Sequence, residues 1–216
     1  MLYDCRAVAD RDRGIAAAID AVRSGELVVF PTDTVYGIGA DAFTPHAVTS
    51  LLDAKGQDRG SPPPVLVGSR HTLDGLVFTL PTAARDLVEA FWPGGLTIIV
   101  EHSPTLQWDL GETGGTIAVR MPLHPVALEV LRETGPMAVS SANKHGMPPA
   151  NTAEEARDQL AYSVRAYLEA GPAADPVPST IVDLTGEAPR LLRPGAIPIE
   201  KLRDVVPDIV VESRVA

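Results

Sequence analysis

A polar loop near the N-terminus is the first place where side chains could do chemistry. Residues 30–39, Phe-Pro-Thr-Asp-Thr-Val-Tyr-Gly-Ile-Gly, set hydroxyl and carboxylate groups between an apolar run and two glycines. Hydroxyls such as that of Thr34 can bind a polar ligand through hydrogen bonds. Asp and Thr also bond readily to their own backbone, so a turn stabilised by its own side chains explains the segment equally well.

A second group of polar residues combines cations with small side chains. In Lys-Gly-Gln-Asp-Arg-Gly-Ser, residues 55–61, the cations Lys55 and Arg59 lie among small residues, a composition suited to holding the oxygens of a triphosphate. The glycine spacing is not that of a Walker A loop. The alternative is a solvated turn in which Lys55 complements the dipole at the end of a helix.

Two further groups lie on or beside predicted strands. Ser141 and Asn143 follow an apolar run, where short side chains let a nucleotide approach the backbone and Asn can both donate and accept. Thr116 and Arg120 share one face of a strand, and the arginine could clamp a carboxylate. A purely structural turn and a surface ion pair are the respective alternatives.

The C-terminal part adds two short strings, Ser-Thr-Ile-Val-Asp from Ser179 and Leu-Arg-Pro-Gly around Arg193. The five histidines show no metal-ligand spacing, so we expect no metal bound by protein side chains. No Gly-x-Ser-x-Gly elbow supports hydrolase chemistry.

Alternating apolar patterns predict the elements that carry these groups. Helices are expected over 15–22, from 44 to 55 with Thr44 as N-cap, around 87–91, over 125–133, after the Thr152 and Glu155 capping box, and over 199–205. Strands are expected over 26–30, 65–67, 96–100, 115–120, 137–141, 165–168, 180–184 and 190–192, with a loop over 31–39. Such alternation predicts an α/β domain whose ligands bind at the strand ends.

Composition limits the function classes. A formal charge of −10 argues against binding nucleic acid over the whole surface, although a local basic cleft is compatible with it. One cysteine excludes an internal disulfide, and no apolar run reaches the roughly 20 residues of a membrane helix. The N-terminus lacks the pattern of a secretory signal. We therefore expect a cytoplasmic protein without membrane contact.

Taken together, the strings resemble the threonylcarbamoyl-adenylate synthase family, whose domain is called YrdC-like. The 31–37 segment, Lys55, the Ser-x-Asn of residues 141–143, the Arg-x-Pro that begins at Arg120 and the two C-terminal strings occur in the family's order. The resemblance runs from about residue 14 to 198. It implies one domain over 1–216 with a YrdC-like core at about 14–200. The implied fold is a twisted mixed sheet with flanking helices and a concave groove.

The resemblance also implies an activity, the joining of L-threonine, bicarbonate and ATP into threonylcarbamoyl-AMP and pyrophosphate, for the modification of tRNA. Mg²⁺ would accompany ATP, a tRNA-modifying threonylcarbamoyl transferase complex would receive the product, and the chain itself could contact tRNA. The implied catalytic residues are Lys55 and Arg59. The implied ATP contacts are Lys55, Gln57, Ser61, Thr116, Ser141, Asn143 and Arg193. The implied threonine contacts are Thr34, Arg120 and Ser179.

One residue departs from the family pattern. Where the family usually has Lys-x-Arg, this chain has Lys55 and then Gln57, which donates hydrogen bonds but carries no charge. Either Arg59 reaches the same phosphate or the nucleotide binds more weakly. An RNA-binding YrdC-like module and a relative that uses carbamoyl-adenylate are the alternative functions. The length leaves no room for the extra domains that such carbamoyl-transfer relatives carry.

Overall fold

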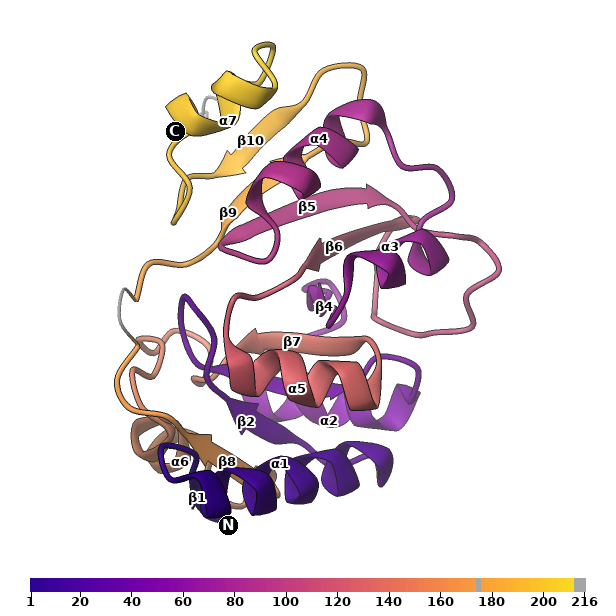
Figure 1. Cartoon of the computed structure of the whole chain (residues 1–216). Helices are drawn as coiled ribbons and strands as arrows, with labels where there is room; N and C mark the ends of the chain where they lie inside the picture. The colour runs from indigo at the N-terminus through magenta and orange to yellow at the C-terminus, as the bar shows by residue number, and fades with distance from the viewer. Residues whose placement is uncertain (174–175, 212–216) are drawn as a thin grey trace.

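A single mixed sheet organises the chain in the computed structural model, which describes residues 1–173 and 176–211 (Figure 1). Its strands are β1 (Leu2–Asp4), β2 (Val28–Phe30), β3 (Gly37–Asp41), β4 (Val65–Leu66), β5 (Leu96–Glu101), β6 (Thr116–Arg120), β7 (Met137–Ser141), β8 (Ala166–Glu169), β9 (Thr180–Asp183), β10 (Arg190–Arg193) and β11 (Val210–Val211). The helices are α1 (Val8–Arg23), α2 (Pro45–Lys55), α3 (Arg70–Leu76), α4 (Thr82–Phe91), α5 (Pro125–Thr134), α6 (Ala153–Leu160) and α7 (Ile199–Val205). The predicted α/β class, with one mixed sheet and flanking helices, is confirmed.

The strand order divides the sheet into two halves. It runs β1-β8-β2-β3-β7-β4-β6-β5-β9-β10-β11, so the two-residue strand β4 joins the half that ends in β7 to the half that begins with β6. β4 pairs antiparallel with β7 and parallel with β6. In Figure 1 the two halves lie below and above β4.

Helices cover both faces of the lower half. Ile15, Ala18 and Val22 recur at helical spacing and bury the inner face of α1, which packs beside α5 over β2 and β7. α2 and α6 lie on the opposite face, where Val48 and Leu51 belong to the larger apolar core (Figure 1). In the upper half, α4 and α7 pack together beside β5.

The segment predicted as a loop over 31–39 ends earlier than expected. Residues 37–41 form β3, a central strand between β2 and β7. A Cβ on Gly37 would lie 2.8 Å from a Val139 methyl carbon, and one on Gly39 would lie 2.8 Å from the Met137 methyl carbon. The glycines that resemble loop punctuation are therefore needed for close packing within the sheet.

The two predicted helix caps are correct in position, and one differs in its bonding. Two other helices begin earlier than predicted, α1 at Val8 and α4 at Thr82. Thr152 accepts a hydrogen bond from the Glu155 N–H at 3.2 Å, as the capping box requires. Thr44 stands at the N-cap of α2, but its hydroxyl donates to Asp41 at 2.6 Å instead of accepting from the helix. Within 1–173 and 176–211, none of the helices combines the length and apolarity needed to cross a membrane.

Candidate active site

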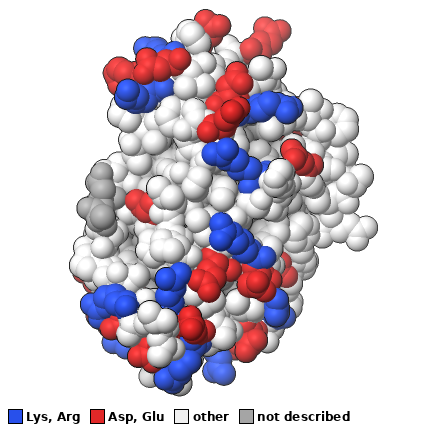
Figure 2. Space-filling view, in the orientation of Figure 1, with Lys and Arg blue, Asp and Glu red and all other residues white. Residues whose placement is uncertain are grey.

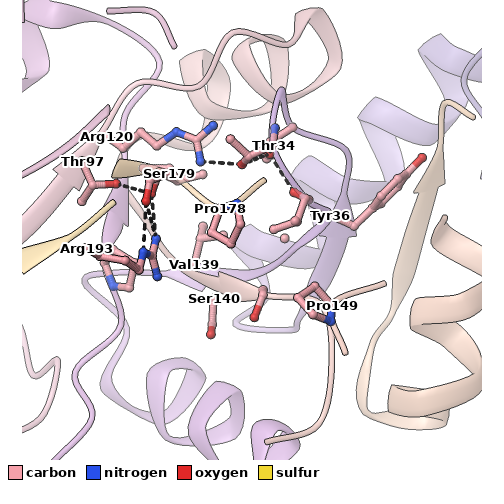
Figure 3. Close-up of a pocket in the computed structure, with 16 residues that line it drawn as sticks. Thr34, Tyr36, Thr97, Arg120, Val139, Ser140, Pro149, Pro178, Ser179 and Arg193 are labelled. Carbon is pink, nitrogen blue, oxygen red and sulfur yellow. Dashed lines mark hydrogen bonds between the residues drawn. The ribbon is translucent and has the colours of Figure 1, made fainter. Parts of the chain in front are cut away.

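A cleft of about 310 Å³ opens where the two halves of the sheet meet (Figure 3). It is lined by Thr32, Thr34, Val35, Tyr36, Gly37, Pro64, Leu66, Thr97, Arg120, Val139, Ser140, Ser141, Pro149, Pro178, Ser179 and Arg193. The 32–37 segment and the end of β7 form one wall. β5, β6, β9 and β10 deliver the other. The cleft therefore collects residues from both halves, with hydroxyls and two guanidinium groups among them.

Arg120, at the end of β6, is held by three acceptors. Its Nε donates to the Gly94 carbonyl at 2.9 Å, one terminal nitrogen donates to Thr34 Oγ1 at 2.8 Å, and the other donates to Asp33 at 2.5 Å. The residue is only 6% exposed. Burial lowers the pKa of Arg120, and the Asp33 carboxylate opposes that effect. The guanidinium is thus fixed in position, and the N–H groups outside these bonds can serve a ligand.

The hydroxyl of Thr34 is oriented by its neighbours. Thr32 Oγ1 donates to the Val35 carbonyl at 2.7 Å, which uses its only proton. In the 3.1 Å contact between the two threonine hydroxyls, Thr34 is then the donor. Thr34 also accepts from Arg120, and its remaining lone pair is available to accept from a ligand N–H.

Arg193 and Ser179 form the opposite corner. Arg193 donates to the Ser179 carbonyl at 3.0 and 2.8 Å and to the Ser179 hydroxyl at 3.0 Å. That hydroxyl also lies 2.7 Å from Thr97 Oγ1 (Figure 3). Burial lowers the pKa of Arg193, and the charge of Arg120 adds to the effect. Two partly desolvated cations that repel each other make the cleft favourable for an anion.

Lys55 lies beneath the cleft instead of lining it. It is 3% exposed, and its Nζ donates to the Ser141 carbonyl at 2.6 Å, the Asn143 carbonyl at 2.5 Å and Asn143 Oδ1 at 3.1 Å. The Asn143 amide in turn donates to the carbonyls of Lys144 and Met147. Burial lowers the pKa of Lys55 to about 8. Lys55 and Asn143 therefore shape the turn that presents Ser141 to the cleft.

The rest of the cation-rich segment does not line the cleft. Arg59 forms an ion pair with Asp109 at 2.5 Å, with its side chain 55% exposed. Its carbonyl also accepts from the Glu112 N–H, so the segment is tied to the loop after β5. Gln57 is half-buried and Ser61 is exposed, and neither lines the cleft. Arg59 is thus paired with Asp109 outside the cleft lining, and its role at the phosphates stays a prediction.

Thr116 is also separate from the cleft. It starts β6, donates to the Thr113 carbonyl at 2.9 Å and lines a different hollow beside Phe78 and His102. Thr116 and Arg120 share a face of the strand, but four residues correspond to roughly 13 Å along it. The placement does not support the predicted nucleotide contact of Thr116.

Several cleft residues were not singled out from the sequence. Asp33 pairs with Arg120, and Tyr36, Thr97 and Ser140 line the cleft. Thr97 had a usable signal, because it is a hydroxyl residue in the otherwise apolar Leu96–Val100 run. Among the described residues, no group of three or more His, Cys, Asp or Glu side chains could hold a metal ion.

Comparison with known proteins assigns the family. Residues 20–195 match the model of the Sua5/YciO/YrdC family, described as "Telomere recombination". The chain belongs to the Sua5/YciO/YrdC family. A Mycobacterium tuberculosis member, described as "Putative threonylcarbamoyl-AMP synthase", is 57% identical over 204 residues, which cover 94% of each chain.

Longer members of the Sua5/YciO/YrdC family share the same core. A Bacillus subtilis threonylcarbamoyl-AMP synthase is 37% identical over 204 residues, covering 94% of this chain and 59% of the relative. The crystal structure of Pyrococcus abyssi Sua5 complexed with L-threonine superposes with a TM-score of 0.92 at 34% identity, covering 98% of this chain. This chain spans 62% of that longer structure.

Proposed function

We propose that this protein is a threonylcarbamoyl-AMP synthase, which joins L-threonine, bicarbonate and ATP and releases pyrophosphate. The observation that carries the proposal is the cleft itself, where the buried guanidinium group of Arg120 and the more exposed guanidinium group of Arg193 flank the hydroxyls of Thr34 and Ser179. The family's named synthases, and the relative crystallised with L-threonine, support this assignment.

The reaction brings anions together. The amine nitrogen of threonine forms a bond to the carbon of bicarbonate with loss of water, which gives a carbamate. A carbamate oxygen then attacks the α-phosphorus of ATP, and the bond to the departing pyrophosphate breaks. Fixed cations reduce the repulsion between carbamate and phosphate, and the cleft holds the two reactants in contact.

The geometry supports specific roles on the amino-acid side. Arg120 binds the threonine carboxylate with the N–H groups that Gly94, Thr34 and Asp33 leave available. Thr34, whose hydroxyl accepts toward the cleft, receives a substrate N–H. Ser179, at the opposite corner, binds a further polar group of the amino acid.

On the nucleotide side, Arg193 contacts phosphate oxygens and Ser141 contacts the nucleotide. Lys55 and Asn143 act by holding the turn at Ser141. Mg²⁺ arrives with ATP, because phosphate oxygens and water are the ligands it prefers. The product passes to a tRNA-modifying threonylcarbamoyl transferase complex in the cytoplasm.

A direct assay tests the activity. Purified protein with ATP, Mg²⁺, L-threonine and bicarbonate should release pyrophosphate and form an adenylate whose mass includes threonine and one carbon dioxide unit. Omitting threonine or bicarbonate should each abolish product. Pyrophosphate release that ignores both omissions would refute the proposal.

Replacing Gln57 by arginine should strengthen nucleotide binding. We expect the KM for ATP to fall about fivefold with little change in kcat, because a charge-assisted bond to phosphate is stronger than a neutral one by about 1 kcal/mol. Thr49→Arg adds the same charge on the exposed face of α2 and should leave the KM unchanged. An unchanged KM in Gln57→Arg would show that position 57 does not reach the phosphates.

The alternative functions gain no specific support. On the face shown in Figure 2, Lys and Arg side chains are interspersed with Asp and Glu and form no continuous basic surface. The formal charge of −10 also opposes RNA binding. A tRNA contact would therefore be local, at the mouth of the cleft.

A further inference from the structure

A buried carboxylate lies behind the cleft and takes no part in the roles assigned above. Glu169 ends β8 and is 3% exposed. Its Oε2 accepts from the Ala153 N–H at 2.7 Å, and its Oε1 accepts from the Gly171 N–H at 2.5 Å. The Tyr36 hydroxyl lies 3.3 Å from Oε1. No lysine or arginine side chain in the described part of the chain forms a salt bridge with it.

These contacts reach three separate segments, and each segment supplies a cleft residue. Tyr36 lines the cleft itself, with its phenol directed away from the cavity (Figure 3). Ala153 begins α6, four residues after the cleft residue Pro149. Gly171 starts the crossover to β9, which delivers Pro178 and Ser179.

Additional bonds tie the same segments together around Glu169. The Tyr36 hydroxyl donates to the Gly171 carbonyl at 2.7 Å and accepts from the Ala170 N–H at 3.0 Å. The Ala173 N–H donates to the Asn151 carbonyl at 3.0 Å. The Tyr36 carbonyl accepts from Ala142, beside the Ser141 turn. Movement at Glu169 would thus be transmitted to the wall of the cleft that Tyr36 and the Ser141 turn form.

We propose that Glu169 is a positioning residue for the synthase reaction, which holds the wall of the cleft formed by Tyr36 and the Ser141 turn through its contacts with Tyr36, Ala153 and Gly171. The inference rests on the proposed function. Glu169 does not touch the substrates in this arrangement, since it is absent from the cleft lining. It acts through the segments that carry Tyr36 and Pro149.

Glu169→Gln is the sharpest variant. The amide keeps one acceptor oxygen but turns an NH₂ group toward an N–H donor, so Ala153 or Gly171 loses its partner. We expect kcat/KM for L-threonine and ATP to fall about tenfold to 100-fold at a temperature where the variant is folded. Glu169→Asp should recover part of the loss. Glu133→Gln, at an exposed carboxylate, should match the wild type.

The pH dependence of the activity distinguishes a positioning role from a role in stability alone, because a purely structural residue would leave this dependence unchanged. Burial, and then the carboxyl group of Glu154, raise the pKa of Glu169. As the pH is lowered, activity should therefore be lost at a higher pH than the protonation of an ordinary carboxyl group would cause. Glu154→Gln should shift this loss of activity to lower pH. The titratable or charged groups that face Glu169 from the surrounding elements are Asp4, Cys5, Arg6, Tyr36 and Glu154.

Two outcomes decide the proposal. If Glu169→Gln has a lower melting temperature but wild-type kinetic constants per folded molecule, the residue is only structural and the proposal is wrong. Hydrogen exchange at Ala153 and Gly171, and calorimetric binding of L-threonine, are measured in parallel. A wild-type protein that makes no adenylate would refute the proposed function, while these two measurements would still show whether Glu169 controls the cleft.

Discussion

Arg120→Met is expected to abolish measurable threonine-dependent activity and to lower the free energy of unfolding by about 3–5 kcal/mol. The guanidinium holds Asp33, Thr34 and the Gly94 carbonyl at once, so its removal leaves the Asp33 carboxylate unpaired and Thr34 free to rotate. Arg120→Lys should restore charge but not activity, because one ammonium cannot reproduce the planar set of donors. Steady-state kinetics and urea unfolding measure the two effects.

Arg11→Met is the matched control for this change. Arg11 pairs with Glu129 at 2.9 Å, but both side chains are partly exposed, at 32% and 46%. Such pairs contribute about 0–1 kcal/mol, so stability and activity should stay close to those of the wild type. If Arg120→Met binds L-threonine with wild-type affinity, Arg120 is not the carboxylate ligand.

Lys55→Met should have the second largest effect. The ammonium satisfies the carbonyls of Ser141 and Asn143 and the Asn143 side chain, and a thioether cannot replace these bonds. We expect a loss of about 3 kcal/mol in unfolding free energy, since each buried unsatisfied group costs about 1–3 kcal/mol. The KM for ATP should rise because the turn at Ser141 loses its support. Lys201→Met, at a 69% exposed side chain, is the control.

The pH dependence of stability gives an independent check on Lys55. Burial lowers its pKa to about 8, against 10.5 for an ordinary lysine. Between these values the unfolded chain binds the proton more tightly than the folded chain does. The unfolding free energy of the wild type should therefore rise with pH, relative to that of Lys55→Met, across this interval. Below pH 8 the two curves of unfolding free energy against pH should run parallel. If the two curves stayed parallel over the whole pH range, the buried environment would not perturb the pKa of Lys55.

The sequence predicts most of the fold because long apolar patterns determine it. α7 over Ile199–Val205 and β7 over Met137–Ser141 match the predicted ranges, since burial and period agree there. The predicted loop over 31–39 was wrong at its C-terminal end, where β3 begins at Gly37. The glycines there serve close packing against Val139 and Met137, which the local sequence does not reveal. The two-residue strand β11 and the short helix α3 were not predicted, because they are too short to show a periodic spacing of apolar residues.

The site is partly predictable for a related reason. Motif residues such as Thr34, Ser179 and Arg193 do meet in one cleft, although their ligand roles stay predictions. Arg59 was expected at the phosphates, but nothing in its local sequence indicates that Asp109, fifty residues later, is its partner. Glu169 gave no motif at all, because its role depends on three segments distant in sequence.

The narrowness of β4 bears on the mechanics of the molecule. In the described part of the chain, Val65 and Leu66 carry the register pairs between the two halves of the sheet, and Pro64 and Val67 add one backbone hydrogen bond each, to Val139 and Arg120. β5 and β6, by comparison, share four register pairs. A sheet bends most easily where the fewest hydrogen bonds resist bending. We therefore expect the slowest collective motion to be a hinge motion of the two halves about β4, which opens and closes the cleft. A substrate that bridges Thr34 and Arg193 would restrict that motion. The conformational entropy lost by the protein would then reduce the net free energy of binding.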